Sequence, residues 1–388
     1  MVIEHSVERI GIALTDTFVS GTARRVANLF CALSLRDPSR YHFLVCEEIY
    51  QGLNSANYHL ENYPNVHELK VRSRFDKKKW ENDSLTLEDL GRVLTLRNFR
   101  NQIARIVKEE GIKILHAHND AVYIFGLRPI PGLVQVASLS SIERRNYDKK
   151  SPFGQLLRFC LPRYDLVDCL SPAIREHVLG CGVPAGRVFC APNSFVDVER
   201  YKPEIKNPDS VVFATRLHGF KNPDLFVDAI KTTYKEHPQA EFHLLGTGPL
   251  REHIANRLHT LEMEDRVHYD FLWDPSKVLN RSSINAQLQQ EDNYPSQSLL
   301  EGMAAGNAII ATDVGLTRRL VDEKNGILIP LSNASALADA MIWMLKHPKE
   351  TITMGRRSRE KVLRSNNVDN YLSYVGELHG RASTLAKR

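Results

Sequence analysis

Short apolar runs alternate along this chain with segments in which apolar residues recur at helical spacing. The first run, Arg9–Thr15, is followed by a loop carrying Ser20-Gly21, and then by apolar residues at every third or fourth position from Ala23 to Leu33. Short runs that are apolar throughout are typical of strands buried on both faces of a parallel sheet. The alternation therefore predicts a wound α/β fold.

The first half of the chain holds five further runs of this kind: His42–Cys46, Ile112–Ala117, Leu133–Ala137, Leu166–Leu170 and Val188–Ala191. A helical stretch, Thr95–Glu110, lies between two of them. In residues 47–85 charged and aromatic side chains are mixed without a clear period, and no element is assigned there.

The pattern breaks between Asn193 and Ser210, where turn-forming residues dominate, and a second series of strands and helices starts directly afterwards. Its predicted strands are Ser210–Thr215, Glu241–Gly246, Arg266–Tyr269, Ile284–Leu288, Ala308–Thr312 and Gly326–Ile329. Its predicted helices are Pro223–Glu236, Leu250–Leu261, Ser296–Ala305, Ala334–Lys346 and Lys349–Ser365, and a last helical stretch is Val368–Leu378.

Two domains are also what the length favours, because 388 residues exceed what one hydrophobic core usually holds. We expect residues 1–195 to form a first Rossmann-like domain and residues 196–365 a second. Residues 366–388 are expected to form a C-terminal helix that packs back on the first domain. Wound sheets bind ligands beyond the carboxyl ends of their strands, so the two domains are expected to face each other across a cleft that holds the site.

Composition and charge exclude several other classes of protein. No apolar run is long enough to span a bilayer, and the first residues lack the apolar stretch of a secretory signal. The six cysteines show no C-x-x-C spacing, which favours reduced thiols in a cytosolic protein. The net charge of +5 is mild, and no nucleic-acid motif accompanies it. Basic clusters at Arg72–Lys79 and Arg144–Lys150 are either solvated loop charge or a contact with an anionic membrane face or acidic acceptor.

The segment Glu291–Thr312 carries the strongest chemical signal. Ser296 is expected to cap a helix over Gln297–Ala305, whose first amides then lack partners within the helix. Free amides at a helix N-terminus are a site for phosphate. Glu301, on the second turn, could accept hydrogen bonds from vicinal hydroxyls; the alternative is an ordinary solvated glutamate.

Two cations, Arg216 and Lys221, follow the first strand of the second domain. At the carboxyl end of that strand they could neutralise a diphosphate, Arg216 by a bidentate fork and Lys221 as a point charge. Cations at strand ends are common, so the pair gains weight only beside the Glu301 helix. Gly246-Thr247-Gly248-Pro249 either lets backbone approach a nucleotide or forms a tight structural turn.

In order and spacing these motifs resemble glycosyltransferase family 4, the group 1 glycosyltransferases, of GT-B fold. The motifs are Arg216-x4-Lys221, Gly246-x-Gly248, Leu300-Glu301-Gly-Met-Ala-Ala-Gly306, Ala311-Thr312-Asp-Val-Gly315 and Asn325-Gly326-Ile-Leu-Ile-Pro330. Upstream, Ala191-Pro192-Asn193, Val196-Asp197 and Gly21 also fit. The resemblance is dense in the C-terminal half and thin in the N-terminal half, as expected if the N-terminal half recognises the acceptor.

The resemblance implies a role for each matching residue. Arg216 and Lys221 would hold the donor diphosphate, and Glu301 would bind the nucleotide ribose. The remaining donor contacts would be the amides of Ser298 and Leu299, and the glycines Gly248 and Gly21. His118, at the end of an N-terminal strand, would lie near the donor sugar, with His116 as a rival because alternation points both the same way.

One departure concerns the acid that the family carries eight residues before the glutamate. Here that position is Asn293, directly after Asp292. Either Asp292 takes over the role after a shift of the loop, or Asn293 binds the sugar hydroxyl as an amide, or donor activity is reduced. An amide donates and accepts hydrogen bonds but supplies no charge.

The implied function is that of a retaining hexosyltransferase, moving a sugar from a nucleotide diphosphate sugar to a carbohydrate or lipid-linked acceptor in polysaccharide or glycoconjugate biosynthesis. No Asp-x-Asp pair occurs, so no metal and no cofactor beyond the nucleotide sugar are expected. The expected location is cytoplasmic, with peripheral contact at the inner face of the membrane. Alternatives are a non-catalytic subunit that binds sugar nucleotides, and a phosphorylase or epimerase on the same fold.

Overall fold

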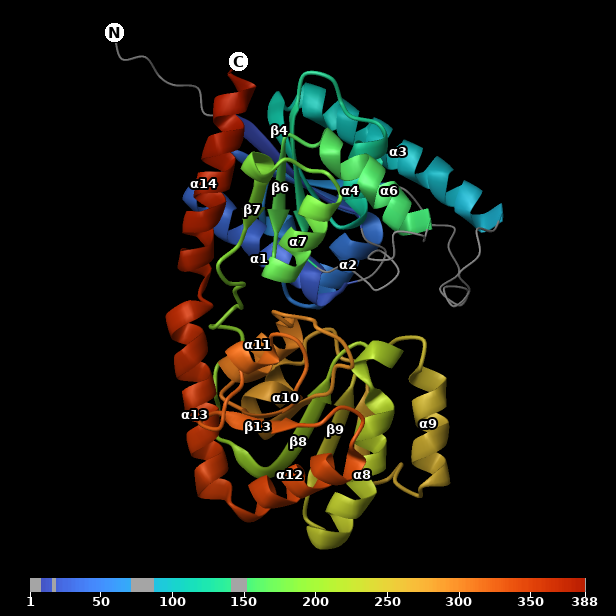
Figure 1. Cartoon of the computed structure of the whole chain (residues 1–388), viewed down its shortest axis with the longest axis vertical. Coiled ribbons are helices and arrows are strands. Elements are labelled where there is room, and N and C mark those ends of the chain that lie inside the picture. Colours follow the sequence, from blue (N-terminus) through green and yellow to red (C-terminus); the bar gives the residue numbers. More distant parts are fainter. Residues whose placement is uncertain (1–7, 16–18, 71–86, 141–151, 388) are drawn as a thin grey trace. The chain divides into compact units, whose positions relative to one another are not determined.

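The computed structural model describes residues 8–15, 19–70, 87–140 and 152–387 (Figure 1). By its contacts the chain divides into two compact units. The first unit comprises Met1–Asn193 together with Asp369–Arg388, and the second comprises Ser194–Val368. Each unit contains one parallel sheet with its own helices, and each is described by itself.

The first unit is built on a seven-stranded parallel sheet in the order β3-β2-β1-β4-β5-β6-β7. Its strands are β1 (Arg9–Leu14), β2 (Tyr41–Cys46), β3 (Val66–Leu69), β4 (Ile112–His118), β5 (Val134–Leu139), β6 (Leu166–Cys169) and β7 (Val188–Cys190). Its helices are α1 (Gly21–Arg36), α2 (Glu47–Ser55), α3 (Leu87–Glu109), α4 (Asp120–Leu127), α6 (Pro152–Cys160), α7 (Pro172–Gly180) and α14 (Val368–Ala386). Six of the seven strands coincide with the apolar runs. Five of them are buried along nearly their whole length, and β7 at the edge of the sheet is only partly buried.

The second unit has a six-stranded parallel sheet in the order β10-β9-β8-β11-β12-β13. Its strands are β8 (Asn207–Ala214), β9 (Glu241–Leu245), β10 (Val267–Asp270), β11 (Ser282–Gln287), β12 (Ala308–Thr312) and β13 (Gly326–Ile329). Its helices are α8 (Pro223–Glu236), α9 (Arg251–Thr260), α10 (Ser276–Arg281), α11 (Gln297–Ala304), α12 (Ala334–Lys346) and α13 (Pro348–Ser365).

Alternate residues of β8 show how this second sheet is buried on both faces. Val211 and Phe213 belong to a core shared with α8, α9 and α12. Val212 and Ala214 belong to a second core, shared with α10, α11 and α13. Because both faces are covered, the strand has no polar side and its sequence is continuously apolar at its centre.

Two partly buried cations bind the carbonyls at the end of α11. The ammonium of Lys206 donates to the carbonyls of Ser282 and Ala305 and to Oδ1 of Asn307, at 2.6–2.7 Å. Arg359 on α13 donates to the carbonyls of Tyr201 and Ala304. The last carbonyls of a helix have no partner within it, so these cations satisfy groups that would otherwise be unpaired.

The C-terminal helix α14 belongs to the first unit, although it follows the second in sequence (Figure 1). Its buried face presents Tyr371, Leu372, Val375, Leu378, His379 and Ala382. Asp369 at its start forms an ion pair with Arg36 at the end of α1, at 2.6 Å. In the described parts of the chain, no helix combines the length and the apolar character needed to cross a membrane.

Candidate functional site

The predicted site residues lie where the strand order of each sheet reverses. In the second sheet the reversal lies between β8 and β11, and the loops after these two strands carry Lys221 and Asn293. In the first sheet it lies between β1 and β4; Gly21 begins α1 after β1, and His118 ends β4. Loops diverge at such a reversal and leave a crevice beyond the strand ends, where wound sheets bind ligands.

Lys221 ends a short 3-10 turn, Gly219–Lys221, and is buried, whereas Arg216 is exposed. Within the described residues the Lys221 ammonium has no hydrogen-bond or ion-pair partner; its Nζ lies 5.2 Å from the centre of the Phe220 ring. Burial lowers the pKa of Lys221 to about 7, an effect that the nearby Glu301 carboxylate partly offsets. The carbonyl of Phe220 accepts from the amide of Gln290 at 2.8 Å, which joins this loop to the one after β11.

The two glycines of the Gly246-x-Gly248 turn pack against the loop that carries the cations. A Cβ at Gly246 would lie 1.9 Å from the carbonyl oxygen of Thr215, and one at Gly248 would lie 2.3 Å from that of Leu217. The amide of Leu217 donates to the carbonyl of Thr247 at 3.0 Å. These contacts explain both glycines structurally, and a contact between Gly248 and a donor stays a prediction.

The first turn of α11 presents free backbone amides. Ser296 occupies the N-cap position, but its side chain does not cap the helix and lies 3.2 Å from Oγ of Ser298 instead. The first amide with a backbone acceptor is that of Leu300. In the described parts of the chain no partner is found for the three amides before it, and phosphate binding by the amides of Ser298 and Leu299 stays a prediction.

Glu301 is buried within α11, with 2% of its surface exposed, and the alternative of a solvated surface glutamate is wrong. The helix lies close to β11 at this turn, because a Cβ at Gly302 would lie 1.9 Å from Nδ2 of Asn285. A buried carboxylate needs a charged or hydrogen-bonding partner. Its charge acts on the Lys221 ammonium, whose pKa it raises against the effect of burial.

Three buried polar residues beside α11 were missed in the sequence. Asn285 and Gln287 in β11 and Gln289 just after it occupy alternate positions, and the amide oxygen of Gln287 accepts from Ser298 at 2.9 Å. The amide of Gln287 donates to Asn285 Oδ1, also at 2.9 Å. The signal was a row of amides at every second position, between the apolar residues Ile284, Ala286 and Leu288.

Asp292 and Asn293 differ in what they contact. Oδ1 of Asp292 accepts from the amides of Tyr294 and Leu316, each at 3.2 Å. A Cβ at Gly315 would lie 2.2 Å from Cγ of Asp292, and Gly315 has a φ of +53°, so this carboxylate lies against a position that only glycine fits easily. Asp292 thus ties its loop to the one after β12, while the side chain of Asn293 is half-buried.

We therefore expect Asp292→Asn to retain most of the activity, because its amide oxygen still accepts both backbone hydrogen bonds. On the alternative that Asn293 binds the sugar hydroxyl, Asn293→Ala is expected to lower kcat/KM about tenfold, the effect of losing one hydrogen bond. The measurement is kcat/KM for the donor in both variants. An equal loss in Asp292→Asn would show that its charge acts on the sugar.

The two candidate histidines of the first unit are both buried and lie on one face of β4, as alternation predicted. Their ring centres are 4.3 Å apart. His116 has internal partners, Ser138 at 2.6 Å and His379 at 3.0 Å. Neither ring nitrogen of His118 has a partner among the described residues. His118, rather than its rival, therefore has the hydrogen-bonding capacity that a ligand could use.

Buried neutral histidines make the first unit sensitive to acid. An exposed imidazole has a pKa of 6.5. Burial lowers the pKa of His116 to about 3. Burial, together with repulsion by the neighbouring His67, lowers the pKa of His42 to about 4. The unfolded chain therefore binds more protons below pH 6.5. The stabilisation is complete above pH 6.5 and is lost towards pH 3–4, at about 1.4 kcal/mol per pH unit for each such histidine.

Hydrogen exchange of the β2 and β4 amides between pH 7 and 5, corrected for intrinsic exchange rates, measures this loss. His116→Asn is expected to make the dependence on pH shallower. A free energy of opening that does not change over this range would contradict the prediction.

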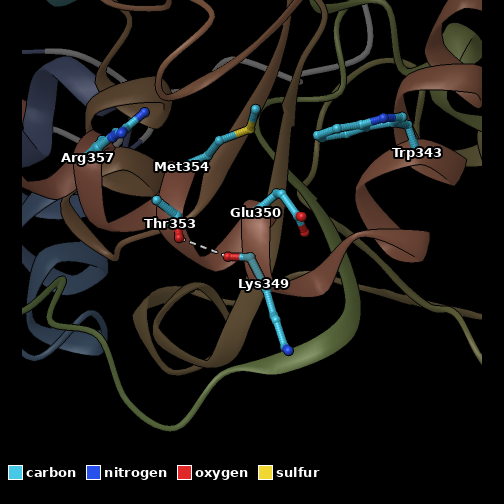
Figure 2. Close-up of a pocket in the computed structure, with 6 residues that line it drawn as sticks. All are labelled: Trp343, Lys349, Glu350, Thr353, Met354 and Arg357. Carbon is cyan, nitrogen blue, oxygen red and sulfur yellow. Dashed lines mark hydrogen bonds between the residues drawn. The ribbon is translucent and has the colours of Figure 1, made fainter.

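A surface hollow between α12 and α13 is lined by Trp343, Lys349, Glu350, Thr353, Met354 and Arg357 (Figure 2). Figure 2 shows Trp343 on one side and Met354 on the other, with the Thr353 hydroxyl bonded to the Lys349 carbonyl of its own helix. No predicted site residue lines this hollow. In the part of the chain that the structure describes, no group of three acidic, His or Cys side chains could hold a metal ion. The basic clusters Arg72–Lys79 and Arg144–Lys150 both lie outside the described residues.

In the comparison with known proteins, the family match lies within the second unit. The family described as Glycosyl transferases group 1 matches residues 208–347. The chain is 21% identical, over 183 residues, to a poly(ribitol-phosphate) alpha-N-acetylglucosaminyltransferase of Staphylococcus aureus, covering 46% of this chain and 37% of the relative. It is 23% identical, over 279 residues, to the N-acetyl-alpha-D-glucosaminyl L-malate synthase of Bacillus anthracis. This match covers 68% of this chain and 73% of the relative. The chain thus spans only about a third of the first relative's length.

Among solved structures, Anabaena HepE in complex with UDP-glucose superposes with a TM-score of 0.75 at 15% identity. The match covers 96% of this chain and 99% of HepE. At this identity the likeness shows the fold alone. It confirms the predicted fold class, two Rossmann-like units of the GT-B type.

Proposed function

We propose that this chain, whose residues 208–347 belong to the group 1 glycosyl transferases, moves a sugar from a nucleotide diphosphate sugar to an acceptor hydroxyl. The observation that carries the proposal is the buried pair of Lys221 and Glu301 beside the free amides of α11. A cation buried without a hydrogen-bonded anion is unfavourable alone and becomes favourable when an anionic ligand binds.

The proposed chemistry is stabilisation of the leaving diphosphate. When the bond between the anomeric carbon and the phosphate oxygen breaks, that oxygen gains the electron pair. Lys221, Arg216 and the α11 amides would stabilise this charge in place, without reorganisation of solvent. Glu301 would accept hydrogen bonds from the nucleotide ribose, because a carboxylate can accept from both hydroxyls of a vicinal diol.

We also propose that the sugar is transferred with its anomeric configuration retained. The acceptor oxygen would attack on the face from which the diphosphate leaves, and its proton would pass to the leaving phosphate. Both curated relatives named above carry an alpha-linked N-acetylglucosaminyl group in their names, which supports this outcome and makes UDP-N-acetylglucosamine the first donor to test. His118 would offer a ring nitrogen to a sugar hydroxyl.

The acceptor, the cofactor requirement and the location belong to the same proposal. We propose a carbohydrate or lipid-linked acceptor in glycoconjugate or polysaccharide biosynthesis, in the cytoplasm at the inner face of a membrane. No cofactor beyond the donor is proposed, because Lys221 and Arg216 can neutralise the diphosphate without a metal. Full turnover in the presence of EDTA is the expected result; dependence on added Mg²⁺ or Mn²⁺ would contradict it.

A thermal-shift screen with UDP, GDP and ADP is the first test of donor binding. A ligand at about 100 times its Kd adds about 2.7 kcal/mol to the stability of the native state. The nucleotide sugar of the stabilising nucleotide is then tested for hydrolysis and for transfer. Binding without either reaction, for every acceptor tried, would favour the non-catalytic subunit; conversion of the donor sugar without an acceptor would favour an epimerase.

The affinity for the nucleoside diphosphate is expected to fall as pH rises above about 7. The pKa of Lys221 is about 7 in the free protein, so above this pH its ammonium must regain a proton when the diphosphate binds. Calorimetry at pH 8 in buffers of different ionisation enthalpy should show net proton uptake. An affinity that stays constant from pH 7 to 9 would show that Lys221 does not contact the phosphates.

A further inference from the structure

The C-terminal helix reaches the end of β4 through a chain of hydrogen bonds inside the first unit. The Tyr374 hydroxyl on α14 donates to Oδ1 of Asp168. Oγ of Ser138 donates to Oδ2 of the same carboxylate at 2.5 Å. Nε2 of His116 lies 2.6 Å from Oγ of Ser138. Its Nδ1 lies 3.0 Å from Nε2 of His379, a residue of α14, so the series of hydrogen bonds begins and ends on this helix.

The carboxylate of Asp168 fixes the direction of the bonds in this chain. Asp168 is buried, and burial raises the pKa of its carboxyl, whereas the hydrogen bonds from Ser138 and Tyr374 and the charge of the buried Arg25 favour its ionised form. A guanidinium stays protonated, and with two donors on its oxygens the ionised carboxylate only accepts. Ser138 gives its one proton to Asp168, so its oxygen can only accept from the ring of His116.

His116 therefore carries its proton on Nε2. Its burial disfavours a second proton, which leaves Nδ1 bare and able only to accept. His379 must then donate from its own Nε2, and its Nδ1 has no partner within the described residues. Both rings are thus held in one tautomer by the protein. His118, whose ring centre lies 4.3 Å from that of His116, has no such internal partner.

We propose that α14 is a positioning element for His118: through Tyr374 and His379 it holds His116 in one neutral tautomer, against which the His118 ring packs. The inference rests on the role proposed above for His118. A change of tautomer or a positive charge on His116 would alter the field at the neighbouring ring and disturb its packing. The other charged or titratable groups around this cluster are Arg25, Arg40, Tyr41, Cys169 and Tyr371.

The test compares two variants of His379 with a matched control. His379→Leu removes the donor to His116, whereas His379→Gln keeps an amide that can donate. The control is His67→Leu, which breaks a similar histidine pair in the same sheet, His42 Nδ1 to His67 Nε2 at 3.1 Å. Ser138→Ala interrupts the series of hydrogen bonds within β5 and leaves the sequence of α14 unchanged. It replaces His379→Leu as the test variant if that variant does not fold.

We expect His379→Leu and Ser138→Ala to lower kcat about tenfold, because a small misplacement of a group at a reaction centre has at least this effect. Nitrogen-15 spectra of the full chain should show a single His116 tautomer, protonated on Nε2, in the unaltered protein. A second tautomer should become detectable in these variants, because each keeps only one of the two hydrogen bonds that favour the first. His379→Gln should restore both readouts, and His67→Leu should change neither.

The positioning role is overturned if His116 keeps one tautomer in both chain-breaking variants, or if they lose no more activity than His67→Leu. His118→Ala separates this result from the proposed function. Full turnover by His118→Ala would remove the role of His118 and this inference with it. Loss of turnover there, together with normal turnover in His379→Leu and Ser138→Ala, would overturn the positioning role alone.

Discussion

Lys221→Met is expected to abolish sugar transfer and to leave the second unit folded. Removing one preorganised group that stabilises a developing anion lowers kcat by about two to three orders of magnitude. Methionine has a similar length and no charge, so it can occupy the buried position that the Lys221 stem fills. The measurement is transfer from the donor identified by the thermal-shift screen.

The stability of Lys221→Met is a second part of this prediction. The pKa of Lys221 is about 7 in the folded chain and 10.5 when exposed, so the unfolded chain binds more protons between these values. The stabilisation present above pH 10.5 is therefore lost as pH falls to 7, and burying the ammonium opposes folding at neutral pH. The variant should unfold at the same temperature as the unaltered chain or higher. Full activity in the variant would exclude the proposed phosphate contact.

Lys206→Met is expected to have the opposite pattern, loss of stability with retained chemistry. The pKa of Lys206 is also lowered to about 7 by burial, but its ammonium donates to several oxygens around the end of α11. Removing it leaves three close acceptors without a donor, which we expect to lower the free energy of unfolding by about 3 kcal/mol.

Urea unfolding of the two lysine variants, followed by hydrogen exchange in α11, measures this difference. The folded fraction of Lys206→Met should retain its kcat, because no predicted site residue contacts Lys206. If the two variants were equally stable, the network around Lys206 would not hold the end of α11, and the contrast between the two buried lysines would be wrong.

Most strands of the two sheets could be predicted, because central strands buried on both faces, such as β2 and β12, are largely apolar. The missed elements lack this signal. β3 is only partly buried at Val66, His67 and Glu68, and α10 has only six residues, too few to show a helical period. β8 begins at Asn207, inside the segment predicted as a connection, because Asn207 pairs with Ser282 far along the chain.

The candidate site could be predicted in its residue types but not in its contacts. The motifs gave Lys221 and Glu301, whereas their burial depends on how α11 and the loop after β8 pack on the sheet. The internal contacts of Asp292 depend on Gly315, 23 positions later, whose φ only the fold determines. The pairing of His116 with His379 joins residues 263 positions apart, and no local sequence pattern predicts it.

The first unit is discontinuous in the sequence, since the whole second unit lies between β7 and α14. Synthesis proceeds from the N-terminus, and domains generally fold as they emerge. The second unit can therefore be complete on the ribosome while the first still waits for its last helix. Until then His116 and Asp168 lack their partners on α14. The first unit thus reaches its final structure only once α14 has been synthesised, after the strands of both sheets.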